Sequence, residues 1–220
     1  MRKPGTLEKP PLGTRSVGEG HIVVISGPSG VGKGTIIKKL MERNPQWLLA
    51  ISATTRPRRQ HEEHGKDYFF VSREEFQEMI QQLELVEYEE VYGNLYGTLR
   101  RELEKASEGD ILIVEVDIRG ARTIKGLYPH AVTIFISPPS IDELIRRLRK
   151  RDSDDERSLR RRLRALPNEL DQAKEFEYIV INDELERAVE ALEAIANASR
   201  YRRFFQLDQV MALRDEVKSL

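Results

Sequence analysis

Short apolar runs recur along the chain and predict four strands of a buried sheet. They lie at residues 21–26 (HIVVIS), 111–117 (ILIVEVD), 131–137 (AVTIFIS) and 177–182 (EYIVIN). Their apolar residues are consecutive rather than alternate, so both faces of each strand are expected to be covered. That arrangement is typical of a parallel sheet.

Between these runs, apolar residues recur every three or four positions and predict helices. The segment 35–44 places Ile36, Ile37 and Leu40 on one face, and the segment 183–198 repeats the pattern. Alternating strands and helices predict an α/β fold of three layers (α/β/α), in which a mostly parallel sheet is the middle layer.

Two segments depart from this alternation. Residues 51–98 contain shorter strands (DYFFVS and LVEYEEVYG) around a helix opened by a capping box of Ser72 and Glu75. This texture predicts a small antiparallel insertion. Between Arg146 and Arg164 the chain carries nine arginines, one lysine and four acids, unlike the parallel core.

The predicted organisation has one core with several additions. The core comprises residues 21–50, 99–143 and 169–200, the insertion spans 51–98, and the arginine-rich segment spans 144–168. Residues 1–20 are rich in proline and glycine and predict a flexible arm. Residues 201–220 predict a helical extension whose apolar side chains need a surface to cover.

Composition narrows the class of protein. The 220 residues include 36 basic and 37 acidic side chains, so net charge favours neither a nucleic acid nor a membrane as partner. The absence of cysteine excludes disulfides, thiol catalysis and cysteine-ligated metals. No apolar run approaches the roughly 18 residues of a membrane span, and no secretory signal is recognisable. We therefore expect a cytoplasmic protein.

The turn after the first strand carries the clearest chemistry. Gly27, Gly32 and Lys33 fit the phosphate-loop pattern G-x-x-x-x-G-K, with a strand before and a helix after it. Glycines let backbone N–H groups converge on phosphate oxygens at the positive end of the helix, and the lysine adds a charge. The predicted ATP-phosphate site comprises Gly27, Pro28, Ser29, Gly30, Val31, Gly32, Lys33, Gly34 and Thr35.

The expected magnesium ligand departs from this pattern. The position after the lysine is commonly Ser or Thr, but here it is Gly34, and the hydroxyl follows at Thr35. One residue rotates a helical position by about 100°, so Thr35 does not simply substitute. We expect Mg²⁺ to be held mainly by nucleotide oxygens and water, with no protein ligand assigned.

The insertion carries groups suited to a second phosphate and to a base. Arg56, Arg58 and Arg59 lie within four positions, and guanidinium groups bind phosphate in pairs of hydrogen bonds. On these residues alone, a solvated basic loop remains an alternative. Further on, the Glu87 carboxylate can accept from the two adjacent N–H groups of guanine, and Thr98 can donate to its carbonyl oxygen.

Seven blocks in this order and spacing resemble a guanylate kinase: GPSGVGKGT, SATTRPRR, GKDYFFV, VEYEEVYGNLYGT, VEVDIRGA, IFISPPS and IVIND. The resemblance covers roughly residues 21–200. It implies a P-loop fold with a GMP-binding insertion at 51–98 and a lid at 144–168. It also implies transfer of the γ-phosphoryl group of ATP to GMP.

The resemblance also implies roles for individual residues. By position, the GMP-phosphate ligands are Arg56, Arg59, Tyr68 and Tyr96, and the guanine ligands are Ser52, Glu87, Thr98 and Asp117. Asn182 lies near the adenine, and Arg151 and Arg162 are the lid arginines. Lys33, Arg56, Arg151 and Arg162 form the expected catalytic set. Glu115 stands where aspartate is common, which leaves its reach toward magnesium or GMP open.

Other interpretations remain at this point. A related module binds protein partners without turnover, although it need not keep the ATP loop that Lys33 completes. A kinase of the same architecture could use another phosphate-bearing acceptor. The arginine-rich segment is a poor nucleic-acid site because acids interrupt it and no aromatic residues interleave. His61 and His64 are three positions apart, not the four of a zinc helix motif, and predict a solvated polar turn. Nothing indicates the oligomeric state.

Overall fold

The computed structural model describes residues 20–60, 62–91, 93–107, 109–151 and 156–218. Its centre is a five-stranded parallel sheet in the order β2-β7-β1-β8-β9. The strands are β1 (His21–Ser26), β2 (Leu48–Leu49), β7 (Ile111–Glu115), β8 (Val132–Ser137) and β9 (Tyr178–Ile181). The predicted parallel sheet is confirmed, and the two-residue edge strand β2 is an addition that its short sequence did not predict.

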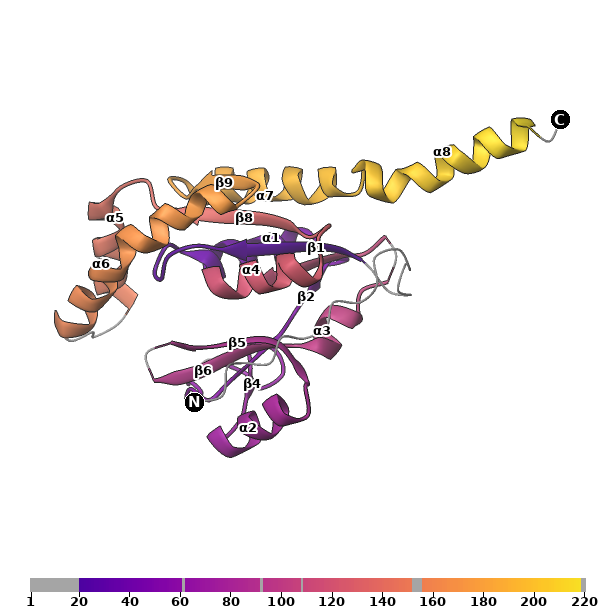
Figure 1. Cartoon of the computed structure of the whole chain (residues 1–220). Coiled ribbons are helices and arrows are strands. Elements are labelled where there is room, and N and C mark those ends of the chain that lie inside the picture. Colours follow the sequence, from indigo (N-terminus) through magenta and orange to yellow (C-terminus); the bar gives the residue numbers. More distant parts are fainter. Residues whose placement is uncertain (1–19, 61, 92, 108, 152–155, 219–220) are drawn as a thin grey trace.

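Helices cover both faces of this sheet (Figure 1). The helices α1 (Lys33–Arg43) and α7 (Leu185–Ser199) pack on one face, and α4 (Ile118–Leu127) packs on the other. Alternate residues of β1 serve the two layers: Ile25 is buried with α1 and α7, and Val24 is buried with α4. This two-sided burial explains the continuous apolar runs.

The insertion forms a second sheet in the order β4-β3-β6-β5. Its elements are β3 (Ser52–Thr54), β4 (Phe69–Phe70), α2 (Arg73–Gln81), β5 (Leu85–Val91) and β6 (Asn94–Leu99). Strand β6 is antiparallel to β3 and β5, as expected, but β4 is parallel to β3. The Ser72–Glu75 capping box opens α2 as predicted. This sheet has its own apolar cluster, which comprises Ala53, Phe76, Leu85, Leu95 and Leu99.

A buried carboxylate links the two sheets where the chain passes between them. Helix α3 (Arg100–Glu104) follows β6 directly. On α3, the Glu102 carboxylate accepts hydrogen bonds from the backbone N–H of Ile51 at 2.8 Å and from Lys105 Nζ at 2.7 Å. Glu102 therefore ties the start of the insertion to the segment that leaves it.

The arginine-rich segment forms the helices α5 (Ile141–Arg151) and α6 (Glu156–Asp171), followed by a short 3₁₀ helix at Gln172–Glu175. Leu144, Leu148, Leu159 and Leu166 form an apolar cluster between the two helices. The division of the chain into core, insertion and lid stays a prediction. Of the predicted arm, residues 1–19 lie outside the described residues.

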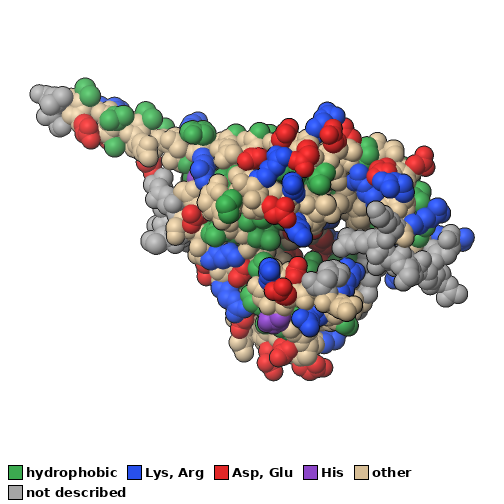
Figure 2. Space-filling model, turned by 180° about the vertical axis from the view of Figure 1, so that it is seen from behind, with side chains coloured by type: hydrophobic (Ala, Val, Ile, Leu, Met, Phe, Trp, Pro, Cys, Tyr) green, Lys and Arg blue, Asp and Glu red, His purple; other side chains and the backbone are tan. Residues whose placement is uncertain are grey.

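The last helix, α8 (Arg203–Lys218), continues away from the body of the molecule (Figures 1 and 2). Its first turn is anchored, because the Phe204 ring stacks on His130 and the Phe205 ring lies edge-on to His21 at 4.2 Å. Beyond that turn, large apolar side chains are exposed, from 42% at Leu207 to 69% at Val217. Beyond its first turn, α8 therefore buries no large apolar side chain against the described part of this chain, and the surface that these side chains would cover is not identified.

None of the described helices is long and apolar enough to cross a bilayer.

Candidate nucleotide-binding site

The phosphate loop lies between β1 and α1, as the sequence predicted. Helix α1 begins at Lys33, and Gly32 precedes it with φ = 102°. A Cβ atom at Gly32 would lie 2.6 Å from Asn182 Nδ2, so both conformation and space require glycine there. The backbone N–H groups of the first turn are thus presented at the start of a helix, where anions bind.

The lysine of the loop is held over the loop itself. Lys33 Nζ donates to the carbonyl oxygens of Gly27 at 2.7 Å and Pro28 at 3.2 Å. These contacts keep the ammonium group of Lys33 against the backbone at the start of the loop. The positive charge therefore lies where phosphate oxygens would meet the loop.

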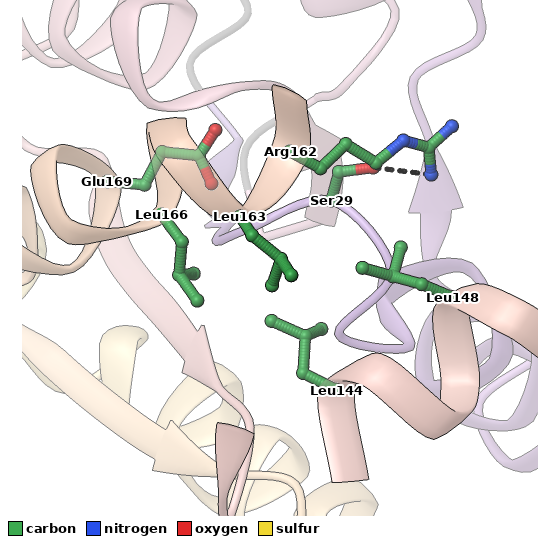
Figure 3. Close-up of a pocket in the computed structure, with 7 residues that line it drawn as sticks. All are labelled: Ser29, Leu144, Leu148, Arg162, Leu163, Leu166 and Glu169. Carbon is green, nitrogen blue, oxygen red and sulfur yellow. Dashed lines mark hydrogen bonds between the residues drawn. The ribbon is translucent and has the colours of Figure 1, made fainter. Parts of the chain in front are cut away.

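The arginine-rich helices approach the same loop. Arg162 on α6 places Nη1 3.5 Å from Ser29 Oγ, at the limit of a hydrogen bond. Figure 3 shows Arg162 reaching toward Ser29 beside a pocket whose other walls include Leu144, Leu148 and Leu166. Arg151 is the last residue of α5, and its side chain lies outside the described part of the chain.

Two further side chains fix the far side of the loop. Asn182, directly after β9, is buried and donates from Nδ2 to the Val31 carbonyl at 2.8 Å. Arg147 on α5 donates to the same carbonyl at 2.9 Å and to the Asn182 carbonyl at 2.9 Å. Sequence reasoning did not single out Arg147, because these two partners lie 116 and 35 positions away in the chain. Arg147 also donates to Glu143, which lies four positions earlier in the same helix.

The predicted guanine ligands meet where β5 and β6 approach the start of α4. Glu87 on β5 is opposite Thr98 on β6, and Thr98 Oγ1 donates to Glu87 Oε1. Ser52 on β3 is opposite Thr98 on the other side. Asp117 caps α4 by accepting from the Gly120 N–H at 2.7 Å. The structure therefore brings these four residues from three strands and a helix terminus into one region.

The surroundings of Glu87 raise the pKa of its carboxyl group. Burial raises the pKa of Glu87 from its ordinary value of 4.5 to about 7. The hydrogen bond from Thr98 opposes this shift, while the nearby Asp117 carboxylate reinforces it. The carboxyl group therefore exchanges its proton near neutral pH.

The predicted phosphate ligands of the insertion also lie together. The Arg56 guanidinium lies over the Tyr68 ring at 5.5 Å, and the Tyr68 and Tyr96 ring centres are 6.0 Å apart. Arg59 is close in the same turn. Sequence reasoning missed a neighbour of these ligands: Glu62, expected in a solvated turn, is only 8% exposed and pairs with Arg56 at 2.7 Å.

Oxygen ligands for magnesium are available beside the loop, but they are few. Glu115 ends β7 opposite Ile25 of the neighbouring β1, and Thr35 lies in the first turn of α1. Such oxygen donors suit Mg²⁺. Within the described ranges, no group of three or more His, Cys, Asp or Glu side chains forms a metal cage. The donor set fits an ion that takes most of its ligands from nucleotide and water.

Several known proteins are similar to this chain in sequence and fold. The family described as guanylate kinase matches residues 19–199. A guanylate kinase of Synechococcus sp. (strain JA-3-3Ab) is 45% identical over 80% of this chain and 82% of its own length. One of Caldanaerobacter subterraneus subsp. tengcongensis is 42% identical over 90% of this chain and 97% of its own. The crystal structure of guanylate kinase from Anaplasma phagocytophilum matches with a TM-score of 0.66 and 33% identity, covering 84% of this chain and 87% of that one.

Proposed function

The chain belongs to the guanylate kinase family, and from that premise we propose how its own residues transfer the γ-phosphoryl group of ATP to GMP, giving ADP and GDP. The observation that carries the proposal is the pairing of two sites. The phosphate loop follows strand β1 of the parallel sheet. The pair of Glu87 and Thr98, which is suited to guanine, lies where the second sheet approaches α4.

ATP binds at the phosphate loop. Backbone N–H groups at the start of α1 contact its phosphates, and Lys33 supplies charge to the outer ones. Asn182 lines the adenine side and keeps the loop in place through the Val31 carbonyl. Arg151 and Arg162, from α5 and α6, close over the transferring group. The Arg162–Ser29 contact supports this, because it already brings α6 to the loop.

GMP binds at the insertion. Glu87 accepts the two adjacent N–H groups of guanine, and Thr98 contacts the base carbonyl, with Ser52 and Asp117 beside them. Arg56, Arg59, Tyr68 and Tyr96 hold the phosphate. Adenine offers no matching pair of N–H donors, so the carboxylate selects guanine.

The chemistry needs alignment rather than a general base, because the acceptor is already a phosphate oxyanion. Lys33, Arg56, Arg151 and Arg162 neutralise the charge that spreads over the transferring group in a loose transition state. We propose that the insertion and the lid at 144–168 close together over the bound substrates. Closure excludes water and so suppresses hydrolysis of ATP.

Mg²⁺ would enter with ATP and would be held mainly by nucleotide oxygens and water. Thr35 and Glu115 are the oxygen-bearing side chains beside the loop, and neither is assigned as a ligand. The ion would supply positive charge that neutralises the ATP phosphates. Gly34 has open space around it, so packing does not explain why the common hydroxyl is absent at that position.

A partner-binding module without turnover is not favoured, because this chain keeps the glycines and Lys33 of the ATP loop and is similar over most of its length to proteins named guanylate kinase. A cytoplasmic location and the absence of nucleic-acid partners stay predictions.

The test is ADP formation from Mg-ATP with GMP, AMP, CMP and UMP supplied separately. Turnover confined to GMP is expected. Turnover with all four would contradict the role of Glu87 and Thr98 in reading the base. Absence of turnover with every acceptor, despite ATP binding, would contradict the kinase assignment itself.

A second experiment separates the two sites. Glu87→Ala should raise KM for GMP by roughly tenfold or more, since hydrogen bonds to a charged group are lost. The Kd for ATP should change little. Glu90→Ala is the matched control, because Glu90 lies on the same strand but is exposed and pairs with the exposed Arg73. Equal losses of GMP and ATP affinity in Glu87→Ala would contradict the assignment.

A further inference from the structure

One buried acid in the insertion has no role in the mechanism described so far. Glu62 lies in the turn between β3 and β4, among residues that are mostly exposed, yet it is only 8% exposed itself. A buried carboxylate is costly unless it is paired and hydrogen-bonded. Its partners therefore indicate what the burial is for.

Both oxygens of the Glu62 carboxylate are engaged. Oε2 accepts from the backbone N–H of Arg59 at 2.9 Å, and Oε1 accepts from Arg56 Nη2 at 2.7 Å. The backbone of Glu62 is fixed as well: its N–H donates to the Arg59 carbonyl at 3.1 Å, and its carbonyl accepts from Arg58 Nη1 at 3.1 Å. One oxygen thus anchors the carboxylate to the turn, and the other holds the Arg56 side chain.

Arg56 needs this partner because its own surroundings are poor in water. Its side chain is 15% exposed, and its guanidinium lies over the Tyr68 and Phe70 rings at 5.5 and 5.7 Å. Of the five guanidinium N–H groups, one donates to Glu62 and one to the Pro57 carbonyl, and the side chain also forms a hydrogen bond with Tyr96, so the remaining N–H groups can donate to a phosphate. A phosphate can therefore contact Arg56 while the pair with Glu62 stays intact.

We propose that Glu62 is a positioning residue for the acceptor phosphate: it is anchored to the backbone of Arg59 and holds the Arg56 guanidinium in the place where GMP needs it. The inference rests on the proposed function, which assigns Arg56 to the GMP phosphate. Glu62 acts through Arg56 and does not itself touch the substrate.

The charge state of the pair agrees with this role. Burial alone would raise the pKa of Glu62. The hydrogen bonds from Arg56 and from the Arg59 N–H outweigh this effect, together with the positive charges of both arginines, so the pKa of Glu62 is below its ordinary value. Glu62 therefore stays ionised at neutral pH and is available to Arg56 throughout the working range of the enzyme.

The test is a double-mutant cycle of Glu62→Gln and Arg56→Ala, with KM for GMP, KM for ATP and Tm measured for each variant. Glutamine keeps the size of the side chain, but it loses the charge and one of the two acceptors. Glu62→Gln alone should raise KM for GMP by about tenfold and leave KM for ATP within about twofold. In the Arg56→Ala background it should add about twofold or less, because its target is gone.

The matched control is Glu63→Gln, which changes the neighbouring carboxylate. Glu63 is exposed and pairs with the exposed Lys66 at 3.6 Å, so its replacement should leave both KM values unchanged. A lower KM for GMP in Glu62→Gln would overturn the proposal, since it would mean that Glu62 competes with the phosphate. So would the same fold-change in both backgrounds, or a parallel rise in both KM values with a lower Tm.

The two single variants also distinguish a failure of this inference from a failure of the proposed function. If Arg56→Ala leaves KM for GMP unchanged, the phosphate assignment fails, and the role of Glu62 fails with it. If Arg56→Ala raises KM for GMP and Glu62→Gln does not, the assignment stands and only the inference fails.

Discussion

At the scale of single residues, the proposed role of Glu87 in binding guanine should make the use of GMP depend on pH. Only the ionised carboxylate can accept both guanine N–H groups, and burial raises the pKa of Glu87 to about 7. Below this pH the folded enzyme binds a proton there. We expect kcat/KM for GMP to fall toward tenfold per pH unit below about pH 7, as the ionised fraction falls.

The control for this pH profile is Glu87→Gln, measured with the same substrates. GMP has ionisations of its own, and both proteins share them, so the difference between the profiles reports Glu87. The variant should be weaker at pH 8 and should lack the additional fall below pH 7. An identical profile in both proteins would exclude titration of Glu87 as the cause.

The same residue predicts a cost to stability. Because the folded pKa of Glu87 is above 4.5, the folded state binds more protons than the unfolded state between about pH 4.5 and 7. The free energy of unfolding should therefore decrease as pH rises through this window. Glu87→Gln should be more stable than the parent at pH 8 by about 1 kcal/mol or more, discounted for partial exposure of the side chain. Urea unfolding at pH 5 and pH 8 checks this, with a smaller difference expected at pH 5.

At the scale of elements, the start of α4 lies against Glu87 in the proposed guanine site. A Cβ atom at Gly120 would lie 2.7 Å from Glu87 Oε2, whereas one at Gly126, in the same helix, would meet nothing within 4 Å. Gly120→Ala should displace the carboxylate and raise KM for GMP by roughly tenfold, with KM for ATP little changed.

Gly126→Ala is the paired measurement for this helix. It should leave KM for GMP unchanged and stabilise the protein by up to about 1 kcal/mol, because alanine favours helix. If both alanines raise KM for GMP equally, the effect comes from helix α4 as a whole and not from contact with Glu87.

The elements also show how far sequence reasoning reaches. The four longer strands of the parallel sheet, α1 and the capped α2 were predictable because their signals are local: apolar runs, the glycine turn, and the pair Ser72 and Glu75. The contact of Glu102 on α3 with Ile51 was not predictable, because the two residues are about 50 positions apart. The burial of Glu62 and the loop contacts of Arg147 were missed for the same reason. From the sequence alone, a charged side chain is expected to be solvated, because partners that are distant in the chain cannot be identified from local patterns.

At the scale of the whole molecule, α8 lies outside the matched family segment 19–199 and has no buried residue. A chain that ends at Arg202 should keep its kinase activity within about twofold. It should lose the Phe204 and Phe205 contacts with His130 and His21, which lowers Tm by about 2–4 °C.

A chain that ends at Gln206 keeps both phenylalanines and is the comparison for this truncation. Its Tm should match that of the full chain, as measured by calorimetry. A similar loss of Tm in both truncations would place the stabilising contacts of α8 beyond its first turn, contrary to the exposure found there.

The two proposed substrate sites lie beside separate apolar clusters, one that includes Val31 of the phosphate loop and one inside the second sheet. In terms of folding, this division means that the molecule has two candidate units of cooperative opening, joined near Glu102. The smaller cluster, around Phe76, has fewer buried side chains to resist opening, so amide hydrogens of β3 and β6 should exchange before those of β1 and β7. A population that has opened only there would still bind ATP but would have no acceptor to phosphorylate.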